Sequence, residues 1–96
     1  MVIVWGFTAQ AFLDQLPARQ KLAVEQAVWR LTNNFDSLKS THLKQLKGFR
    51  ERGAEKYYEL RVGADLRVIL TLHGSDAIEI VDIVRRSQIE RLQAVR

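Results

Sequence analysis

Residues 56–72 of the chain read KYYELRVGADLRVILTL and form the centre of the predicted fold. Apolar side chains alternate with others on both sides of residues 63–65, which is typical of two half-buried strands joined by a tight turn. A slip of one residue would send one apolar set to the wrong face, so parity sets the register. The predicted pairs are Val62 with Leu66, Leu60 with Val68 and Tyr58 with Leu70.

The same register places Arg61 opposite Arg67 on the other face of the hairpin. Facing arginines repel each other, which costs stability. Two interpretations stay open: both guanidinium groups reach into solvent, as exposed arginines commonly do, or an anion such as a phosphate belongs between them. Glu59 projects from the same face, where it is either a charge partner or a candidate base.

Composition sets the limits for the rest of the chain. Its 96 residues, 47% hydrophobic and 27% charged, predict a single globular domain over residues 1–96. The absence of cysteine excludes a disulfide framework, a thiolate zinc site and a cysteine nucleophile, and it fits a reducing cytoplasm. Neither a membrane-spanning helix nor a signal peptide is predicted. We also expect no metal or cofactor, because no zinc spacing, Walker loop or dinucleotide fingerprint is present.

The net charge of +4 comes from one segment. Residues 39–61 hold seven basic and three acidic side chains, whereas residues 1–38 and residues 62–96 are each neutral. Such a local excess is typical of a surface that binds a polyanion, either nucleic acid or an acidic protein. A solvated basic loop has the same composition, so both interpretations stay open.

The remaining elements follow from periodicity. Residues 2–7 predict a strand, and residues 8–16 and 17–35 predict two helices separated at a proline, with a capping threonine at the start of the first. Residues 36–55 are polar, basic and poorly periodic, and we expect an irregular loop there. Residues 77–84 predict a further strand that is apolar on both faces, and therefore central in the sheet or bulged.

Polar side chains mark the end of the chain. Asp82 lies within the last strand, where a buried carboxylate needs a partner, and the arginines are the candidates. Residues 87–90 read SQIE, match a capping box and predict a terminal helix that follows Arg85 and Arg86. The whole order predicts an α+β fold, with a small antiparallel sheet of about four strands packed by an N-terminal helical hairpin and a C-terminal helix.

This order of elements resembles the RelE/ParE superfamily of bacterial toxins from toxin–antitoxin systems. The resemblance covers nearly the whole chain and rests on LKG at residues 46–48, on residues 58–70 of the hairpin and on IVRR at residues 83–86. It implies a microbial-ribonuclease-like fold and a type II toxin. It also implies a partner, an acidic and largely disordered antitoxin that orders when it binds.

The resemblance implies two alternative activities. RelE-type toxins cleave messenger RNA on the ribosome without metal, and so inhibit translation. ParE-type toxins inhibit DNA gyrase and cut no RNA. The arginine set favours the ribonuclease. The absence of lysines before the turn and of a tyrosine or histidine after Arg86 favours a gyrase inhibitor or a degenerate toxin retained as a binding protein. We favour the ribosome-associated endoribonuclease.

The resemblance also implies the site residues, since arginines at matching places bind the scissile phosphate in RelE-type toxins. Metal-free cleavage needs a base, an acid and cations around the phosphorane, and arginine suits the last task. The predicted catalytic residues are Arg61, Arg67, Arg86 and Glu59, and the predicted RNA-binding residues are Lys44, Lys47, Arg50, Arg85 and Tyr57. His42 and His73 titrate in a useful range but lie at loops or turns. We expect Arg67→Ala to abolish toxicity and to leave the fold intact or slightly more stable.

Overall fold

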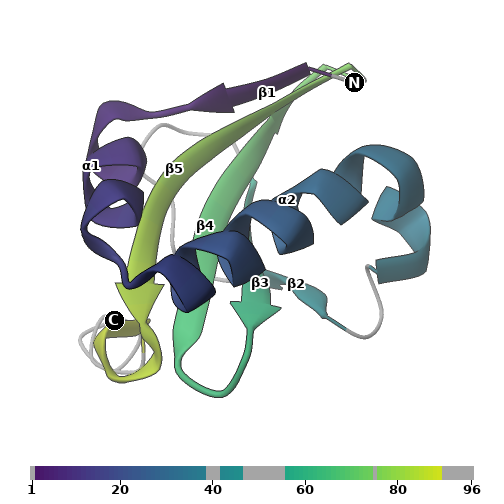
Figure 1. The fold of residues 1–96 in the computed structure, drawn as a ribbon. Coiled ribbons are helices and arrows are strands. Elements are labelled where there is room, and N and C mark those ends of the chain that lie inside the picture. The colour runs from purple at the N-terminus through teal and green to yellow at the C-terminus, as the bar shows by residue number, and fades with distance from the viewer. Residues whose placement is uncertain (1, 39–41, 47–55, 75, 90–96) are drawn as a thin grey trace.

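The computed structural model describes residues 2–38, 42–46, 56–74 and 76–89. The strands are β1 (Val2–Trp5), β2 (Leu43–Leu46), β3 (Tyr57–Val62), β4 (Leu66–His73) and β5 (Ala77–Arg85), and the helices are α1 (Phe7–Gln15) and α2 (Ala18–Leu38). The strands form one sheet in the order β1-β5-β4-β3-β2 (Figure 1). The α+β class is therefore as predicted. Within these ranges, no helix is long and apolar enough to cross a membrane.

The central hairpin of β3 and β4 has the predicted register in every pair, including Arg61 opposite Arg67. Gly63 begins the turn with φ of 64°, a left-handed conformation that glycine adopts without a steric penalty. The hairpin thus brings two arginines together on the face that does not carry its main apolar set.

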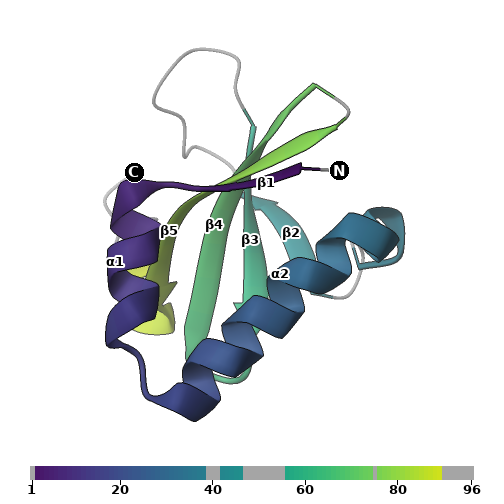
Figure 2. The same cartoon turned by 45° about the horizontal axis from the view of Figure 1, so that its top comes forward.

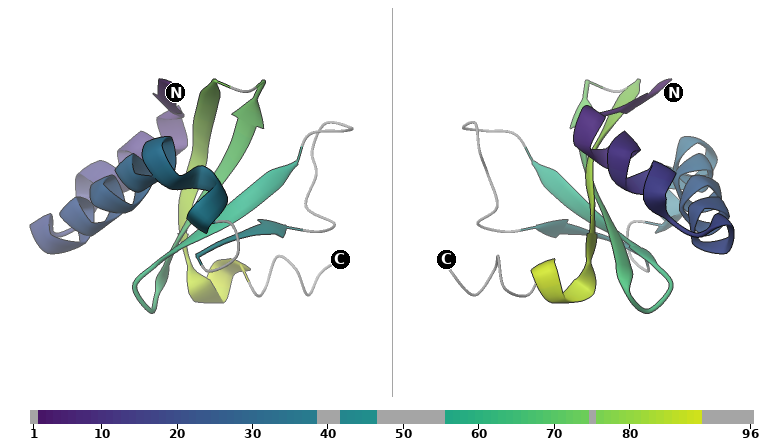
Figure 3. Two further views of the ribbon diagram at one scale, coloured as in Figure 1. Left: turned by 90° about the vertical axis from the view of Figure 1, so that its right-hand side faces the viewer. Right: turned by 60° about the vertical axis from the view of Figure 1, so that its left-hand side comes forward.

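Both helices lie on one side of the sheet (Figure 3), and α2 crosses that face diagonally (Figure 2). Their apolar stripes meet the inward side chains of β3, β4 and β5 in the main core. Its fully buried members include Val24, Leu31, Leu60, Val68 and Ile80. This packing gives the amphipathic helices the partner that their periodicity requires.

The first helix begins earlier than predicted. Gly6, rather than Thr8, is the N-cap of α1. The Gly6 amide donates to the Ile80 carbonyl at 2.8 Å, and the Gly6 carbonyl accepts from the Gln10 amide at 2.9 Å. Since the same residue ends the pairing with β5 and opens the helix, sheet geometry sets the helix start.

The sheet differs from the predicted four antiparallel strands in two ways. β2 lies inside residues 36–55, where a loop was predicted, and α2 also runs to Leu38. Leu43 and Leu46 are both buried, but Leu43 lies in the main core and Leu46 lies on the far face of the sheet, the side opposite the helices. Because they are three residues apart, β2 lacks the period-2 signal of a strand. In addition, β1 pairs in parallel with β5, which makes the sheet mixed.

The last strand was predicted to be central in the sheet or bulged, and β5 is both, since it lies between β1 and β4 and carries a bulge. Ile69 pairs with Asp82 while Leu70 pairs with Ile80, so one residue of β5 has no partner. Past the bulge, the parity of β5 changes, and Asp82 joins the face opposite the helices. The bulge therefore decides which side of the sheet the end of β5 presents.

The far face of the sheet is partly covered rather than open. Residues 86–89 are helical, so the helix begins two positions earlier than the predicted capping box allows, and the Gln88 side chain accepts from the Arg85 amide at 3.0 Å. Glu90, the predicted end of that box, lies outside the described residues. A second apolar cluster forms beneath this helix start and consists of Leu46, Tyr57, Ile69, Val84 and Ile89, with Val81 against it.

Candidate active site

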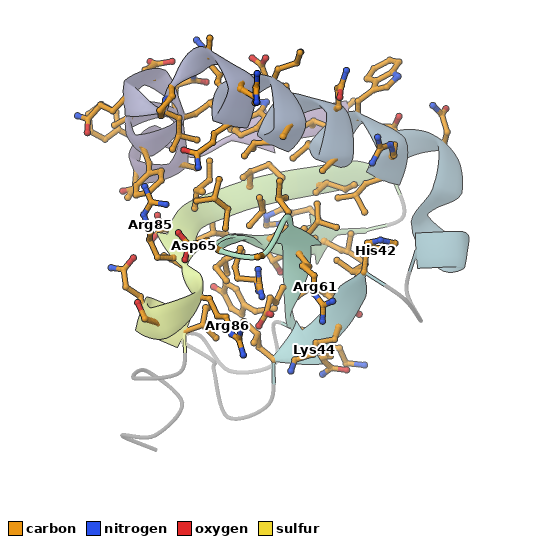
Figure 4. The ribbon with its side chains drawn as sticks, turned by 60° about the horizontal axis from the view of Figure 1, so that its bottom comes forward. His42, Lys44, Arg61, Asp65, Arg85 and Arg86 are labelled. Atoms are coloured by element: carbon orange, nitrogen blue, oxygen red, sulfur yellow. The ribbon has the colours of Figure 1, made fainter. Side chains whose placement is uncertain are left out.

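A cavity of about 460 Å³ opens on the far face, beside the turn of the hairpin. It is lined by Lys44, Glu59, Arg61, Gly63, Ala64, Arg67, Arg86 and Ile89. The four predicted catalytic residues and Lys44 thus meet in one place, although they come from β2, β3, β4 and the helix start after β5. Figure 4 shows Lys44, Arg61 and Arg86 together on this side of the sheet. Four basic side chains surround one carboxylate here, so the cavity favours an anion.

Strand register explains this meeting. Lys44 pairs with Glu59 across β2 and β3, and Arg61 pairs with Arg67 across β3 and β4. Facing residues share a side of the sheet, and so do residues two apart on one strand. Arg86 arrives by a separate contact, because its amide donates to the Asp65 carbonyl in the hairpin turn at 2.7 Å.

Arg67 and Glu59 form a buried ion pair in the cavity floor. The Arg67 side chain is 8% exposed and that of Glu59 12%, and Arg67 Nε lies 3.3 Å from Glu59 Oε2. Arg67 Nη1 also donates to the Leu66 carbonyl at 2.8 Å and, at 3.4 Å, to that of Gly63. The interpretation in which both arginines reach into solvent is therefore wrong for Arg67.

This pairing also reverses the expectation for Arg67→Ala. Removing the arginine would leave the Glu59 carboxylate buried without its countercharge, and breaking a buried pair in this way is strongly destabilising. We therefore expect the Arg67→Ala variant to lose stability. The facing arginines are compatible with each other because Glu59 holds one of them.

One oxygen of Glu59 has an unmet requirement. Glu59 Oε1 is buried, and no donor among the described residues reaches it. A buried acceptor without a donor carries a desolvation cost, which a ligand hydroxyl or ammonium would relieve. The cavity therefore offers cations for an anion and, in the same floor, an acceptor for a proton.

The other cations of the cavity are more accessible. Lys44 and Arg61 are exposed, and no carboxylate in the described part of the chain lies within ion-pair distance of either. Arg86 is also exposed. These three side chains are accessible from solvent, whereas the Arg67 guanidinium is buried and held by the contacts above.

Two predicted RNA-binding residues lie elsewhere. Arg85 turns to the helix side of the sheet, where its Nη1 lies 2.6 Å from Asp65 Oδ2 (Figure 4). Tyr57 is 7% exposed and packs in the second apolar cluster, so it is not placed to stack on a base. Lys47 and Arg50 lie outside the described residues.

Asp82 lacks the predicted arginine partner within the described ranges. The Ile83 amide donates to its Oδ1 at 2.8 Å. Burial raises the pKa of Asp82 above its usual value, and this backbone hydrogen bond opposes part of the rise. Asp82 shares a row with Glu59 through Ile69 but does not line the cavity.

The histidines do not contribute a side chain to the cavity lining. His73 Nε2 lies 2.6 Å from Glu79 Oε1, at the far end of β4. His42 precedes β2, and its carbonyl accepts from the Arg61 amide at 2.9 Å. In the described part of the chain, no group of three or more histidine, aspartate and glutamate side chains could hold a metal ion.

Three solved structures share this fold. The RelE–RelB complex from Pyrococcus horikoshii OT3 matches with a TM-score of 0.70 and 20% identity, over 91% of this chain and 96% of that chain. A YoeB/ParE toxin from Agrobacterium tumefaciens matches with a TM-score of 0.67 and 18% identity, over 90% and 99%. The RelB–RelE complex from Methanococcus jannaschii matches with a TM-score of 0.65 and 21% identity, over 93% and 96%.

The sequence itself provides the assignment. Comparison with curated protein sequences gives no significant match. The model of a family described as "ParE toxin of type II toxin-antitoxin system, parDE" matches residues 3–90, which include every element described above except the first residue of β1. The predicted resemblance is thereby confirmed by sequence and by fold. The chain belongs to the ParE toxin family of type II toxin–antitoxin systems, within the RelE/ParE superfamily.

Proposed function

We propose that this toxin is a metal-free endoribonuclease that cleaves messenger RNA on the ribosome, in the cytoplasm, and so inhibits translation. The observation that carries the proposal is the cavity itself. Its cations suit a phosphodiester, and Glu59 Oε1 offers a buried acceptor with no donor among the described residues. A ribonucleotide presents a phosphate and an adjacent hydroxyl in one group, which meets both requirements.

Each side chain then has a separate task. Arg61 and Arg86 bind the non-bridging oxygens and stabilise the charge that builds up on the phosphorane. Glu59 takes the proton of the 2′-hydroxyl, and Arg67 holds the Glu59 carboxylate in position. The 2′-oxygen forms a bond to phosphorus while the bond to the 5′-oxygen breaks. Lys44, which pairs with Glu59 across β2 and β3, protonates that leaving oxygen.

Gyrase inhibition is the second candidate, and the match to the ParE family model favours it. In that case the cavity cations would contact an anionic surface without chemistry, and the Glu59–Arg67 pair would serve only the fold. The ribonuclease needs a 2′-hydroxyl on its substrate and a Glu59 carboxylate that accepts its proton, whereas the gyrase inhibitor needs neither.

One experiment separates them. Purified toxin is added to a translating extract, where message cleavage is mapped, and to a gyrase supercoiling reaction. We expect cleaved message and unaffected supercoiling, with Arg61→Ala reducing the cleavage rate by roughly 10²–10³, the usual loss for one transition-state contact. Arg19→Ala is the matched control, because it removes an exposed arginine that does not line the cavity. Intact message together with inhibited supercoiling would overturn the ribonuclease proposal.

An antitoxin is the other proposed partner. The RelE structures from Pyrococcus horikoshii and Methanococcus jannaschii were solved as complexes with RelB. We propose that this toxin is neutralised in the same general way by an acidic, largely disordered protein, encoded by a neighbouring gene, that orders on binding. Growth arrest on expression of the toxin alone, relieved by co-expression of the neighbouring gene, is the expected result. Normal growth with the toxin alone would count against it.

A further inference from the structure

The hairpin turn is tied to the end of β5 by two contacts from one residue. The Asp65 carbonyl accepts from the Arg86 amide at 2.7 Å, and Asp65 Oδ2 lies 2.6 Å from Arg85 Nη1. The Arg85 amide in turn donates to Gln88 Oε1 in the first helical turn. We name Asp65 and Arg85 the turn clamp. It joins two segments that the chain separates by some twenty residues.

The two segments joined by the turn clamp carry the walls of the cavity. On the turn side lie Gly63 and Ala64, which line it, and the carbonyls that receive Arg67 Nη1. On the helix side lies Arg86, which enters the cavity directly after the clamped residue. Arg85 and Arg86 point to opposite sides of the sheet (Figure 4). A displacement of the clamp would therefore move Arg86 relative to Arg67.

The energetic scale favours a role in geometry over a role in stability. The side chains of Arg85 and Asp65 are 42% and 54% exposed, and an exposed ion pair adds little to the free energy of unfolding. By contrast, a misplacement of about 1 Å in a charged site can cost about 10²-fold in rate. Losing the clamp should leave the fold intact and loosen the site.

We propose that Asp65 and Arg85 are positioning residues, which hold Arg86 at the distance from Arg67 that a phosphate requires. This proposal rests on the proposed function for its biological meaning, but the anion-binding geometry can be measured separately. It also gives Arg85 a role different from the predicted direct contact with RNA.

Because the two residues of the turn clamp carry opposite charges, the direction of the change in phosphate affinity separates a positioning role from simple charge attraction. Removing Arg85 takes away a positive charge, so simple long-range attraction would weaken phosphate binding in Arg85→Ala. Removing Asp65 takes away a negative charge, so the same attraction would strengthen binding in Asp65→Ala. A positioning role predicts weaker binding in both variants. The reversed pair, Asp65→Arg with Arg85→Asp, should restore part of the loss.

The experiment titrates the full chain with inorganic phosphate and follows the arginine Nε–H signals by NMR, with a melting curve for each variant. We expect both alanine variants to bind phosphate roughly tenfold more weakly, the loss of about one charge-assisted contact, with melting temperatures close to that of the parent protein. Asp14→Ala, which removes another exposed ion pair, is the matched control and should change neither quantity.

Tighter binding in Asp65→Ala would overturn the positioning role, as would phosphate affinities in both variants equal to that of the parent. An Arg86 signal that does not shift with phosphate in the parent protein would show that the anion does not bind at Arg86, and would overturn the proposal. Failure of the proposed function has a different signature. Message would stay intact in the translating extract while the phosphate titration still showed the expected order of affinities.

Discussion

Replacing Glu59 by glutamine tests the buried pair in the cavity floor. The glutamine keeps an oxygen near Arg67 Nε but removes the countercharge of a guanidinium that is only 8% exposed. Breaking a buried pair from one side costs about 3–5 kcal/mol, and we expect the lower end because the glutamine still places a polar oxygen beside the guanidinium. For a domain of this size, each kcal/mol lowers the melting temperature by about 4–8 °C. We therefore expect a fall of about 12 °C or more.

Two variants give this measurement its controls. Glu79→Gln removes a glutamate from the same sheet face, but from an exposed pair with His73, and should cost less than about 1 kcal/mol. Replacing Glu59 and Arg67 together by leucine and methionine should recover most of the loss, since an apolar pair of similar volume often matches a buried ion pair. Thermal and urea unfolding of these proteins, together with the single variants Glu59→Leu and Arg67→Met, completes a double-mutant cycle and gives the coupling energy of the pair.

The result that would refute this reasoning is a Glu59→Gln protein that melts within about 3 °C of the parent, a shift below that expected for the loss of 1 kcal/mol. Glu59 and Arg67 would then be independent side chains, and the placement of Arg67 in the site would need another cause. Message cleavage should be measured well below the lower melting temperature, so that the loss of the proposed base, worth about 10²–10⁴ in rate, is measured on folded protein.

Three further outcomes follow from the fold. Asp82→Asn should raise the melting temperature at pH 7, because burial raises the pKa of this carboxyl and its charged form costs stability; the gain should fade as the pH drops to the unfolded pKa near 4 in a series of melting curves. Gly6→Ala should destabilise by about 1–3 kcal/mol in urea unfolding, since the added methyl group would lie 2.9 Å from the Ile80 carbonyl oxygen. Leu43→Ala should cost about 2–5 kcal/mol in the same assay, because this side chain of β2 belongs to the main core.

The hairpin shows what alternation can specify. Period-2 apolar residues on both sides of a glycine turn allow one register only, and that register alone brings Arg61 to Arg67. A strand that is apolar on both faces is either central in the sheet or bulged, and β5 is both, since it lies between β1 and β4 and carries a bulge. These features depend on local sequence, and the resemblance added Arg86 to the same site.

The features that were missed depend on contacts between distant segments. Leu43 and Leu46 each enter a different core, so β2 carries no alternation to detect. Tyr57 shares a face with Glu59 by parity, but its exposure to solvent depends on packing against distant residues. Ile89, some thirty residues away, belongs to the same buried cluster. Likewise, the local sequence around Glu59 and Arg67 does not predict that both side chains are buried together on the far face.

The most direct test of the cavity as a ribonuclease centre asks whether cleavage needs the 2′-hydroxyl whose proton Glu59 is proposed to accept. After the cleavage site in one message has been mapped in a translating extract, the message is remade with a single 2′-deoxynucleotide on the 5′ side of that phosphate. We expect cleavage to disappear at that phosphate alone, and the unmodified message to yield a 2′,3′-cyclic phosphate end. Equal cleavage of both messages would contradict the role of Glu59 and the chemistry proposed for the cavity.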